Sequence, residues 1–137
     1  MEQVSDFFTL YKNFAWEKDS ESMIKLYDNH VVIFDMWNKG HYSGLTEWSG
    51  IIKQWLGSLK DERVNVIFEM TEIHRDETAG FASSLIKYQA VSTGNKILRS
   101  MTNRITLGFK KTEDSWKVVH QHTSAPINSD LQAIFTE

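Results

Sequence analysis

The second half of this 137-residue chain consists of long segments in which apolar and polar residues alternate. In the first of these segments every second residue is apolar: Val64, Val66, Phe68 and Met70. A period of two is typical of a β-strand with one buried face. Three further strands of this kind are expected over residues 80–92, 96–111 and 115–125. Because the stretches between them are short and polar, the pattern predicts a meander of long antiparallel strands joined by hairpins.

The first 60 residues have helical spacing instead. Apolar residues recur three and four positions apart in three segments, 7–15, 23–27 and 45–59. Asp19 or Ser20 would cap the second helix, and a short strand is expected over 30–35. Helices followed by a meander predict an α+β fold, in which a strongly curved, mostly antiparallel sheet folds around three helices. Such a sheet forms a cone with a pocket at one end.

The composition limits the kinds of binding partner and the cellular location that we expect. The net charge is −3 and no stripe of Lys and Arg is present, so nucleic acid is not an expected partner. The chain has no cysteine, and no apolar run reaches the roughly 18 residues of a membrane span. No cationic segment followed by an apolar run begins the chain. We therefore expect a cytoplasmic protein, without a membrane span or a cofactor, folded as one domain over residues 1–137.

The last strand carries His120 and His122 at alternate positions, and the strand before it carries Arg99 and Arg104. Polar groups on a sheet face must be satisfied by a ligand, by a partner subunit or by each other. Two histidines on one face could bind a metal ion, but a zinc site needs a third ligand. The spacing of the remaining histidines in the sequence does not identify any of them as that ligand. No metal site is therefore predicted. Hydrogen bonds within the sheet, or a dimer contact, are the favoured roles of this pair, and the alternation places Trp116 and Val118 on the same face.

The order of elements and two local motifs resemble a known superfamily. The chain has Phe34-Asp35 before a turn at Gly44, and it closes with the strand W-K-V-V-H-Q-H-T-S-A-P. These features resemble the SnoaL-like, or nuclear transport factor two-like, superfamily. The C-terminal strands are most similar to the association domain of calcium/calmodulin-dependent kinase II, which has a like S-x-x-x-R strand before its closing strand. The resemblance implies a cystatin-like α+β roll that forms homodimers through its sheet face.

The ketosteroid isomerase branch of this superfamily suggests two catalytic residues. In that branch a tyrosine of the first helix donates a hydrogen bond to an enolate, and an aspartate at the end of the first strand moves the proton. Aligning the Asp19 turn places Tyr11 and Asp35 at these positions. A second, protonated acid completes the isomerase site. The corresponding strand offers no carboxylate here but Thr102, Arg104 and Thr106. As alternatives, Asp35 is a turn residue bonded to local backbone and Tyr11 is a core aromatic.

The same resemblance suggests ligand-binding residues. Arg104 matches an arginine of an anion-accepting pocket, and the other basic positions of that pocket fall on Ser84 and Thr123. Arg104 could hold a carboxylate, or it could form an ion pair with Asp35 or a glutamate. Arg99 has the opposite strand parity and is expected on the other sheet face. By kinship, Gln121 and Thr123 face the cavity. Its apolar walls are expected from four aromatic residues, which could equally be ordinary core residues: Trp37, Trp48, Trp55 and Tyr88.

Three functions therefore stay open. The first is a protein that binds a small, largely apolar molecule in the cone pocket, with Arg104 available for a carboxylate. The second is an isomerase, cyclase or dehydratase that abstracts a proton with Asp35. The third is a dimerisation or assembly domain with a vestigial pocket. The tail from Asn128, with Leu131, Ile134 and Phe135, is expected either as a short helix over a neighbour or as a frayed end.

Overall fold

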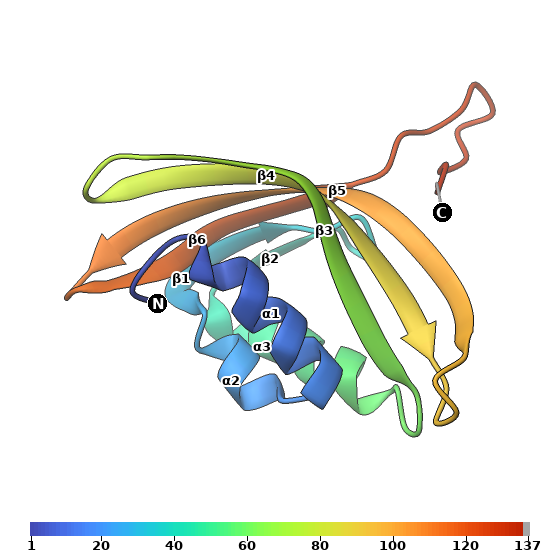
Figure 1. Cartoon of the computed structure of the whole chain (residues 1–137). Coiled ribbons are helices and arrows are strands. Elements are labelled where there is room, and N and C mark those ends of the chain that lie inside the picture. The colour runs from blue at the N-terminus through green and yellow to red at the C-terminus, as the bar shows by residue number, and fades with distance from the viewer. Residues whose placement is uncertain (136–137) are drawn as a thin grey trace.

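The structure is a computed structural model, and it describes residues 1–135. The first part of the chain supplies three helices and two short strands: α1 (Asp6–Glu17), α2 (Ser20–Ile24), β1 (Tyr27–Phe34), β2 (His41–Ser43) and α3 (Leu45–Gly57). The second part supplies the four long strands: β3 (Arg63–Arg75), β4 (Ala79–Val91), β5 (Ile97–Thr112) and β6 (Ser115–Ser124). Helices and sheet form two layers (Figure 1), so the predicted α+β class is confirmed.

The helix boundaries follow from local chemistry. Lys18 ends α1 in the left-handed conformation (φ 57°), and its N–H donates to the Ala15 and Phe14 carbonyls. The Asp19 carboxylate accepts from the Ser22 N–H at 3.1 Å and so caps α2. The prediction that α2 extends to Tyr27 is wrong, because Tyr27 already pairs with Val118 as the first residue of β1. Strand pairing overrides the helical spacing at this point.

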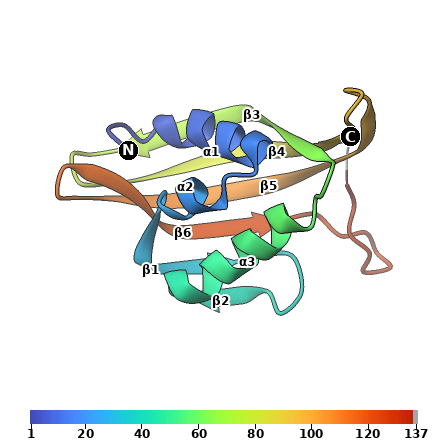
Figure 2. The ribbon, with the colours of Figure 1, turned by 90° about the horizontal axis from the view of Figure 1, so that it is seen from below.

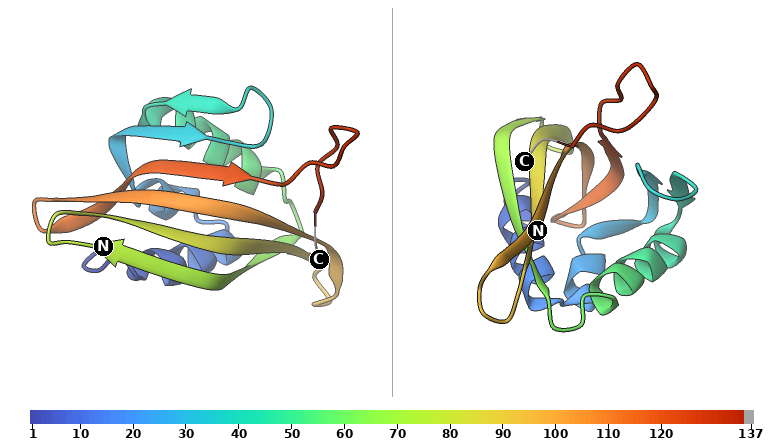
Figure 3. Two further views of the ribbon diagram at one scale, coloured as in Figure 1. Left: turned by 90° about the horizontal axis from the view of Figure 1, so that it is seen from above. Right: turned by 90° about the vertical axis from the view of Figure 1, so that its right-hand side faces the viewer.

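The six strands lie in the order β2-β1-β6-β5-β4-β3. Strand β1 runs parallel to β6, and all the other neighbours are antiparallel. The long strands agree with the predicted meander. Strand β2 was not expected from the sequence; its three residues come directly before the turn at Gly44 and pair with the end of β1. Figure 3 shows the sheet rolled around the helices without closing.

Shifts in strand register bend the sheet, and two of them lie in the β3–β4 and β5–β6 pairs. The register between β3 and β4 shifts between Glu69 and Glu72, where Met70 has a positive φ of 55°. The register between β5 and β6 shifts beside Gly108, which pairs with His120 while Phe109 pairs with Val118. An extra residue in one strand increases the local bend and twist. Both shifts help the long strands to curl over the helices, as the bend of β3 in Figure 1 shows.

The helices cover only one face of the sheet. Helix α1 lies along β3 and α3 lies beneath β1 and β2 (Figure 2). Near the β5–β6 hairpin the space between the layers is filled by side chains with almost no exposed area, among them Phe7, Phe109, Trp116 and Val118. In the described part of the chain no helix is both long and apolar enough to cross a lipid bilayer.

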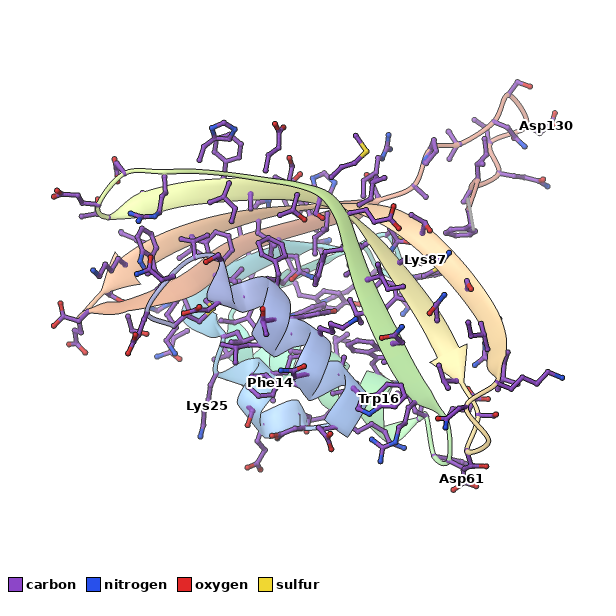
Figure 4. The ribbon with its side chains drawn as sticks, in the orientation of Figure 1. Phe14, Trp16, Lys25, Asp61, Lys87 and Asp130 are labelled. Atoms are coloured by element: carbon purple, nitrogen blue, oxygen red, sulfur yellow. The ribbon has the colours of Figure 1, made fainter. Side chains whose placement is uncertain are left out.

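The tail after β6 is not helical over its described residues, so the expected short helix is wrong. Ile127 and Ala133 form an isolated β-bridge, and the Ile134 N–H donates to the Pro126 carbonyl at 2.7 Å. Asp130 marks the loop of this tail, which stands away from the sheet in Figure 4. Phe135 returns toward the molecule and stacks on Trp37, with ring centroids 5.9 Å apart.

Candidate functional site

A cavity of about 540 Å³ lies between the helices and the inner face of the sheet, at the end away from the β5–β6 hairpin. Aromatic rings form much of its wall: Tyr11, Tyr27, Trp37, Trp48, Trp55 and Tyr88. Its volume is within the range of sites that hold small molecules. Of the predicted wall residues, Trp48, Trp55 and Tyr88 line the interior. Trp37 lies in the loop after Asp35, with 46% of its surface exposed.

Asp35 lines this cavity just beyond the end of β1. The Thr123 hydroxyl donates to Asp35 Oδ1 at 2.9 Å and accepts from the Met36 N–H at 3.2 Å. Burial raises the pKa of the Asp35 carboxyl, and the Thr123 hydrogen bond offsets only part of that rise. A carboxylate with a raised pKa is a better proton acceptor than an ordinary surface aspartate. Neither Arg104 nor Arg99 pairs with it.

Tyr11 and Tyr88 join α1 to the sheet inside the cavity. Their hydroxyl oxygens are 3.1 Å apart, and either group can be the donor. Burial raises the pKa of Tyr11 well above its ordinary value and raises the pKa of Tyr88 to about 12. Both phenols therefore keep their protons at neutral pH. Since two hydroxyls carry two protons and one serves their mutual bond, the pair can offer the other to a bound molecule.

Tyr27 and Gln121 form a second polar pair. The Tyr27 hydroxyl donates to Gln121 Oε1 at 2.6 Å, and both side chains are buried. Burial raises the pKa of Tyr27, so this phenol also stays protonated. The inward position expected for Gln121 and Thr123 agrees with the structure, but each is already hydrogen bonded within the protein. These bonds fix the shape of the cavity.

Asn103 is a cavity residue that sequence reasoning missed. It lies on the inner face of β5, only 4% exposed, and its Oδ1 has no hydrogen-bond partner in the described part of the chain. The alternation of Ile105, Leu107 and Phe109 predicts which face of β5 points inward, and Asn103 belongs to that face. The sequence therefore contained the signal. The resemblance instead led to the residues of opposite parity.

Arg104 is the clearest correction. It is exposed on the outer face of the sheet, where its Nε donates to Ser124 Oγ at 3.2 Å, so it does not line the cavity. The reason is strand parity, because Arg104 follows the inward-facing Asn103. Arg99, expected on the other face, instead lines the cavity and pairs with Glu62 at 2.6 Å, where its side chain is 65% exposed. Ser84 is on the inner face but outside the cavity, bonded to Thr71 at 2.8 Å.

His120 and His122 lie on the outer face, where each packs edge-on against the Phe34 ring, with ring centroids 5.0 and 5.5 Å from it. The prediction that Trp116 and Val118 share this face is wrong, because the register shift beside Gly108 reverses the parity of β6. His120 Nδ1 lies 2.8 Å from the Val32 carbonyl, which is one of the sheet hydrogen bonds favoured for this pair. Within residues 1–135 no three His, Cys, Asp or Glu side chains form a group able to hold a metal ion.

Comparison with known proteins identifies the family. The sequence pattern of the SnoaL-like domain matches residues 4–128. The chain belongs to the SnoaL-like family. This family includes ligand-binding proteins and proteins of the isomerase or cyclase type. No curated protein matches the chain.

Solved structures share the fold of this SnoaL-like domain at low sequence identity. An NTF2-like protein of unknown function from Pseudomonas putida KT2440 superposes with a TM-score of 0.85 at 18% identity, over 98% of this chain and 92% of that one. A proposed calcium/calmodulin-dependent protein kinase II association domain from Xanthomonas campestris has a TM-score of 0.75 at 12% identity, over 90% and 85%. A protein of unknown function with a cystatin-like fold from Nostoc punctiforme has a TM-score of 0.71 at 12% identity, over 88% and 86%. At these identities the likeness shows the fold alone, and the family rests on the match over residues 4–128.

Proposed function

We propose that this SnoaL-like domain binds a small, largely apolar molecule in its cavity. The observation that carries the proposal is an open volume of about 540 Å³ lined by tryptophan and tyrosine rings, inside a fold whose other end is densely packed. Burial of apolar ligand surface against these rings would supply most of the affinity. A vestigial pocket would be expected to fill with side chains, since empty volume in a core destabilises the fold.

Filling the cavity tests this proposal. Ala90 lies on the cavity wall, and Ala90→Phe places a ring in the space that a ligand would use. Titration with naphthalene, followed by fluorescence, should give saturable binding to the wild type and a loss of at least about tenfold in Ala90→Phe. Arg104→Ala is the matched control, because it changes the outer face and should leave binding unchanged. Equal binding by all three proteins would mean that the probe binds elsewhere, and no binding to the wild type would refute the proposal.

We propose, as a second function of the same cavity, proton transfer by Asp35. Its carboxyl group lines the cavity, has a raised pKa and forms no ion pair within residues 1–135. It could take a proton from a carbon next to a carbonyl, while the Tyr11–Tyr88 pair and the Asn103 amide stabilise the negative charge that develops on the oxygen. Tyr11 and Asp35 keep the roles suggested by the family resemblance. In place of the protonated acid of an isomerase site, this proposal uses the neutral amide of Asn103, which lines the same cavity.

Deuterium exchange tests this second function without a known substrate. 2-Tetralone is a neutral aromatic ketone with exchangeable protons beside its carbonyl. In D₂O the wild type should speed its exchange, followed by NMR, and Asp35→Asn should remove at least about 99% of that acceleration, as expected on loss of a general base. Tyr11→Phe should retain part of it. If the wild type and Asp35→Asn exchange at the rate of buffer alone, Asp35 is not a base for such ketones.

We also propose that two copies associate through the outer sheet face. No helix covers this face in the described part of the chain, and it exposes Phe34 and Phe81 at 45% and 51%. The Xanthomonas neighbour, named as a proposed association domain, supports self-association. Phe34→Lys would place a charge in the contact. Light scattering after gel filtration should show a dimer for the wild type and a monomer for this variant, and a monomeric wild type would contradict the proposal.

A further inference from the structure

Two residues of the cavity wall each carry a buried polar atom that has no hydrogen-bond partner within residues 1–135. These atoms are Trp48 Nε1 and Asn103 Oδ1, the two buried side-chain atoms without a hydrogen bond among residues 1–135. Both residues line the cavity, with 7% and 4% of their surface exposed. A buried polar group without a partner destabilises a fold, so such groups are rare and call for an explanation. A bound molecule that satisfies both groups is such an explanation.

The two residues come from opposite layers of the molecule. Trp48 projects from α3 and packs against the rings of Tyr27 and Tyr42, at centroid distances of 6.1 and 5.6 Å. Its indole N–H approaches the Tyr27 hydroxyl and opposes part of the rise in the pKa of that phenol by weak hydrogen bonding, but Nε1 makes no hydrogen bond of good geometry within residues 1–135. The Tyr27 proton is directed to Gln121 instead. The indole N–H is therefore a donor available to a ligand.

Asn103 lies between the two polar pairs that serve the proposed proton transfer. On the inner face of β5 its neighbours are Met101, which pairs with Tyr88, and Ile105, which pairs with Thr123. Its amide therefore sits between the Tyr11–Tyr88 pair and the Thr123–Asp35 pair. A carboxamide both donates and accepts, so it suits a hydroxyl or a carbonyl oxygen.

The charges around the cavity exclude an anionic ligand. Among the lining residues only Asp35 and Arg99 carry charge at neutral pH. Arg99 is already paired with Glu62 and is largely exposed to water. A carboxylate in the interior would face Asp35 without a counter-charge, and desolvation of an unpaired charge is costly. The neutral Trp48 and Asn103 groups are suited to neutral oxygen atoms.

We infer that the cavity selects neutral molecules in which an apolar ring system carries a hydroxyl or carbonyl oxygen, held by the Asn103 amide and the Trp48 indole. This inference rests on the proposed binding function and specifies its ligand class. It replaces the carboxylate expected from the sequence.

Four probes that share one ring system test this selectivity at pH 7: naphthalene, 2-naphthol, 2-naphthoate and 2-naphthylmethylamine. In fluorescence titrations of the wild type, 2-naphthol should bind about tenfold more tightly than naphthalene, the gain expected from one hydrogen bond to an unsatisfied buried group. 2-Naphthoate should bind at least about tenfold more weakly than 2-naphthol. Tightest binding by the amine would indicate a cation site beside Asp35 and would overturn the inference.

Two variants locate the preference. Asn103→Leu and Trp48→Phe each remove one polar group while keeping an apolar side chain of similar shape. In each variant the ratio of 2-naphthol affinity to naphthalene affinity should fall severalfold from the wild-type ratio, since naphthalene affinity measures any change in apolar contact alone. Asn13→Leu is the matched control, because the same substitution at an exposed position of α1 should keep the full preference.

The outcomes separate the two proposals. If naphthalene does not bind the wild type, the binding function fails and this inference fails with it. If naphthalene binds and is blocked by Ala90→Phe, but 2-naphthol gains nothing over it, the binding function stands and the ligand class is wrong. A 2-naphthol preference that survives in both Asn103→Leu and Trp48→Phe also overturns the inference.

Discussion

The inner face of one sheet meets two different interiors in this molecule. Toward the β5–β6 hairpin, the Phe7 ring has no exposed surface. Its centroid lies 5.8 Å from the ring centroid of Phe109, 6.5 Å from that of Tyr27 and 5.3 Å from that of Tyr11. We call this region the packed end. At the other end, the helices and the sheet leave about 540 Å³ open around Asp35. We call this region the open end.

The two ends differ in composition along the same strands. On β5 the inward residues change from Phe109 and Leu107 at the packed end to Asn103 at the open end. On β6 they change from Trp116 and Val118 to Gln121 and Thr123. A buried polar side chain on an otherwise apolar strand face has to be satisfied by something, so this change along the strand marks where the interior stops being a simple core.

Truncation of Phe7 is the largest test of this difference. Phe7→Ala removes a ring with no exposed surface from the packed end and should lower the free energy of unfolding by about 3–5 kcal/mol. Trp55→Ala removes a larger ring from the wall of the open end, where the side chain is only partly buried, and should cost about 2 kcal/mol. Urea unfolding measures both, provided that the slope against denaturant is unchanged. A larger loss for Trp55→Ala would mean that the two ends are equally packed.

Replacing the polar residue Asn103 at the open end should stabilise the protein, whereas truncation at the packed end destabilises it. Asn103→Leu removes an unsatisfied amide oxygen and adds apolar contacts, so it should raise the free energy of unfolding of the ligand-free protein by about 1 kcal/mol. Gln121→Leu is the contrasting variant, because it leaves the buried Tyr27 hydroxyl without its acceptor and should destabilise by about 1–3 kcal/mol. Thermal unfolding of the two variants shows whether each is more or less stable than the wild type. Destabilisation by both would mean that Asn103 has a structural partner.

The regular, one-sided burial of the long strands explains why the sequence predicted them. Alternating residues predicted the long strands to within a few residues, because a sheet with one buried face repeats every second position. Strand β2 has no such signal, since three residues are too few to establish a period, and it depends on pairing with β1. The inward position of Asp35 agreed with the family resemblance. Its role as a base stays a prediction.

The errors in the predicted site concern which face of the sheet a side chain occupies. A shift of one position moves every side chain of a strand to the other face, and this is how Arg104 was expected in the cavity and Asn103 was missed. The register shift beside Gly108 had the same effect on β6, where it separates the inward Val118 from the outward His120. Such a shift is set by pairing between distant segments, so it is invisible in the periodicity of one strand.

The smallest expected effect is the pH dependence of stability contributed by Asp35. Because burial raises the pKa of Asp35 in the folded state, the folded protein holds this proton more tightly than the unfolded chain does. Below the unfolded pKa of about 3.9, ionisation of Asp35 therefore does not reduce the stability of the fold. As the pH rises through the folded pKa, ionisation of Asp35 destabilises the folded protein relative to the unfolded chain. Asp35→Asn removes that term, so the stability of this variant relative to the wild type should be greater at pH 7 than at pH 4.

Asp19 supplies a matched comparison of opposite sign. Hydrogen bonds from Ser22 lower the pKa of Asp19, so its contribution is present above the unfolded pKa and is lost as the pH falls through the folded value. The stability of Asp19→Asn relative to the wild type should therefore be lower at pH 7 than at pH 4. Urea unfolding of the three proteins at both pH values gives the comparison. If Asp35→Asn and Asp19→Asn change in the same direction with pH, Asp35 is solvated like an exposed carboxylate, and the open end does not raise its basicity.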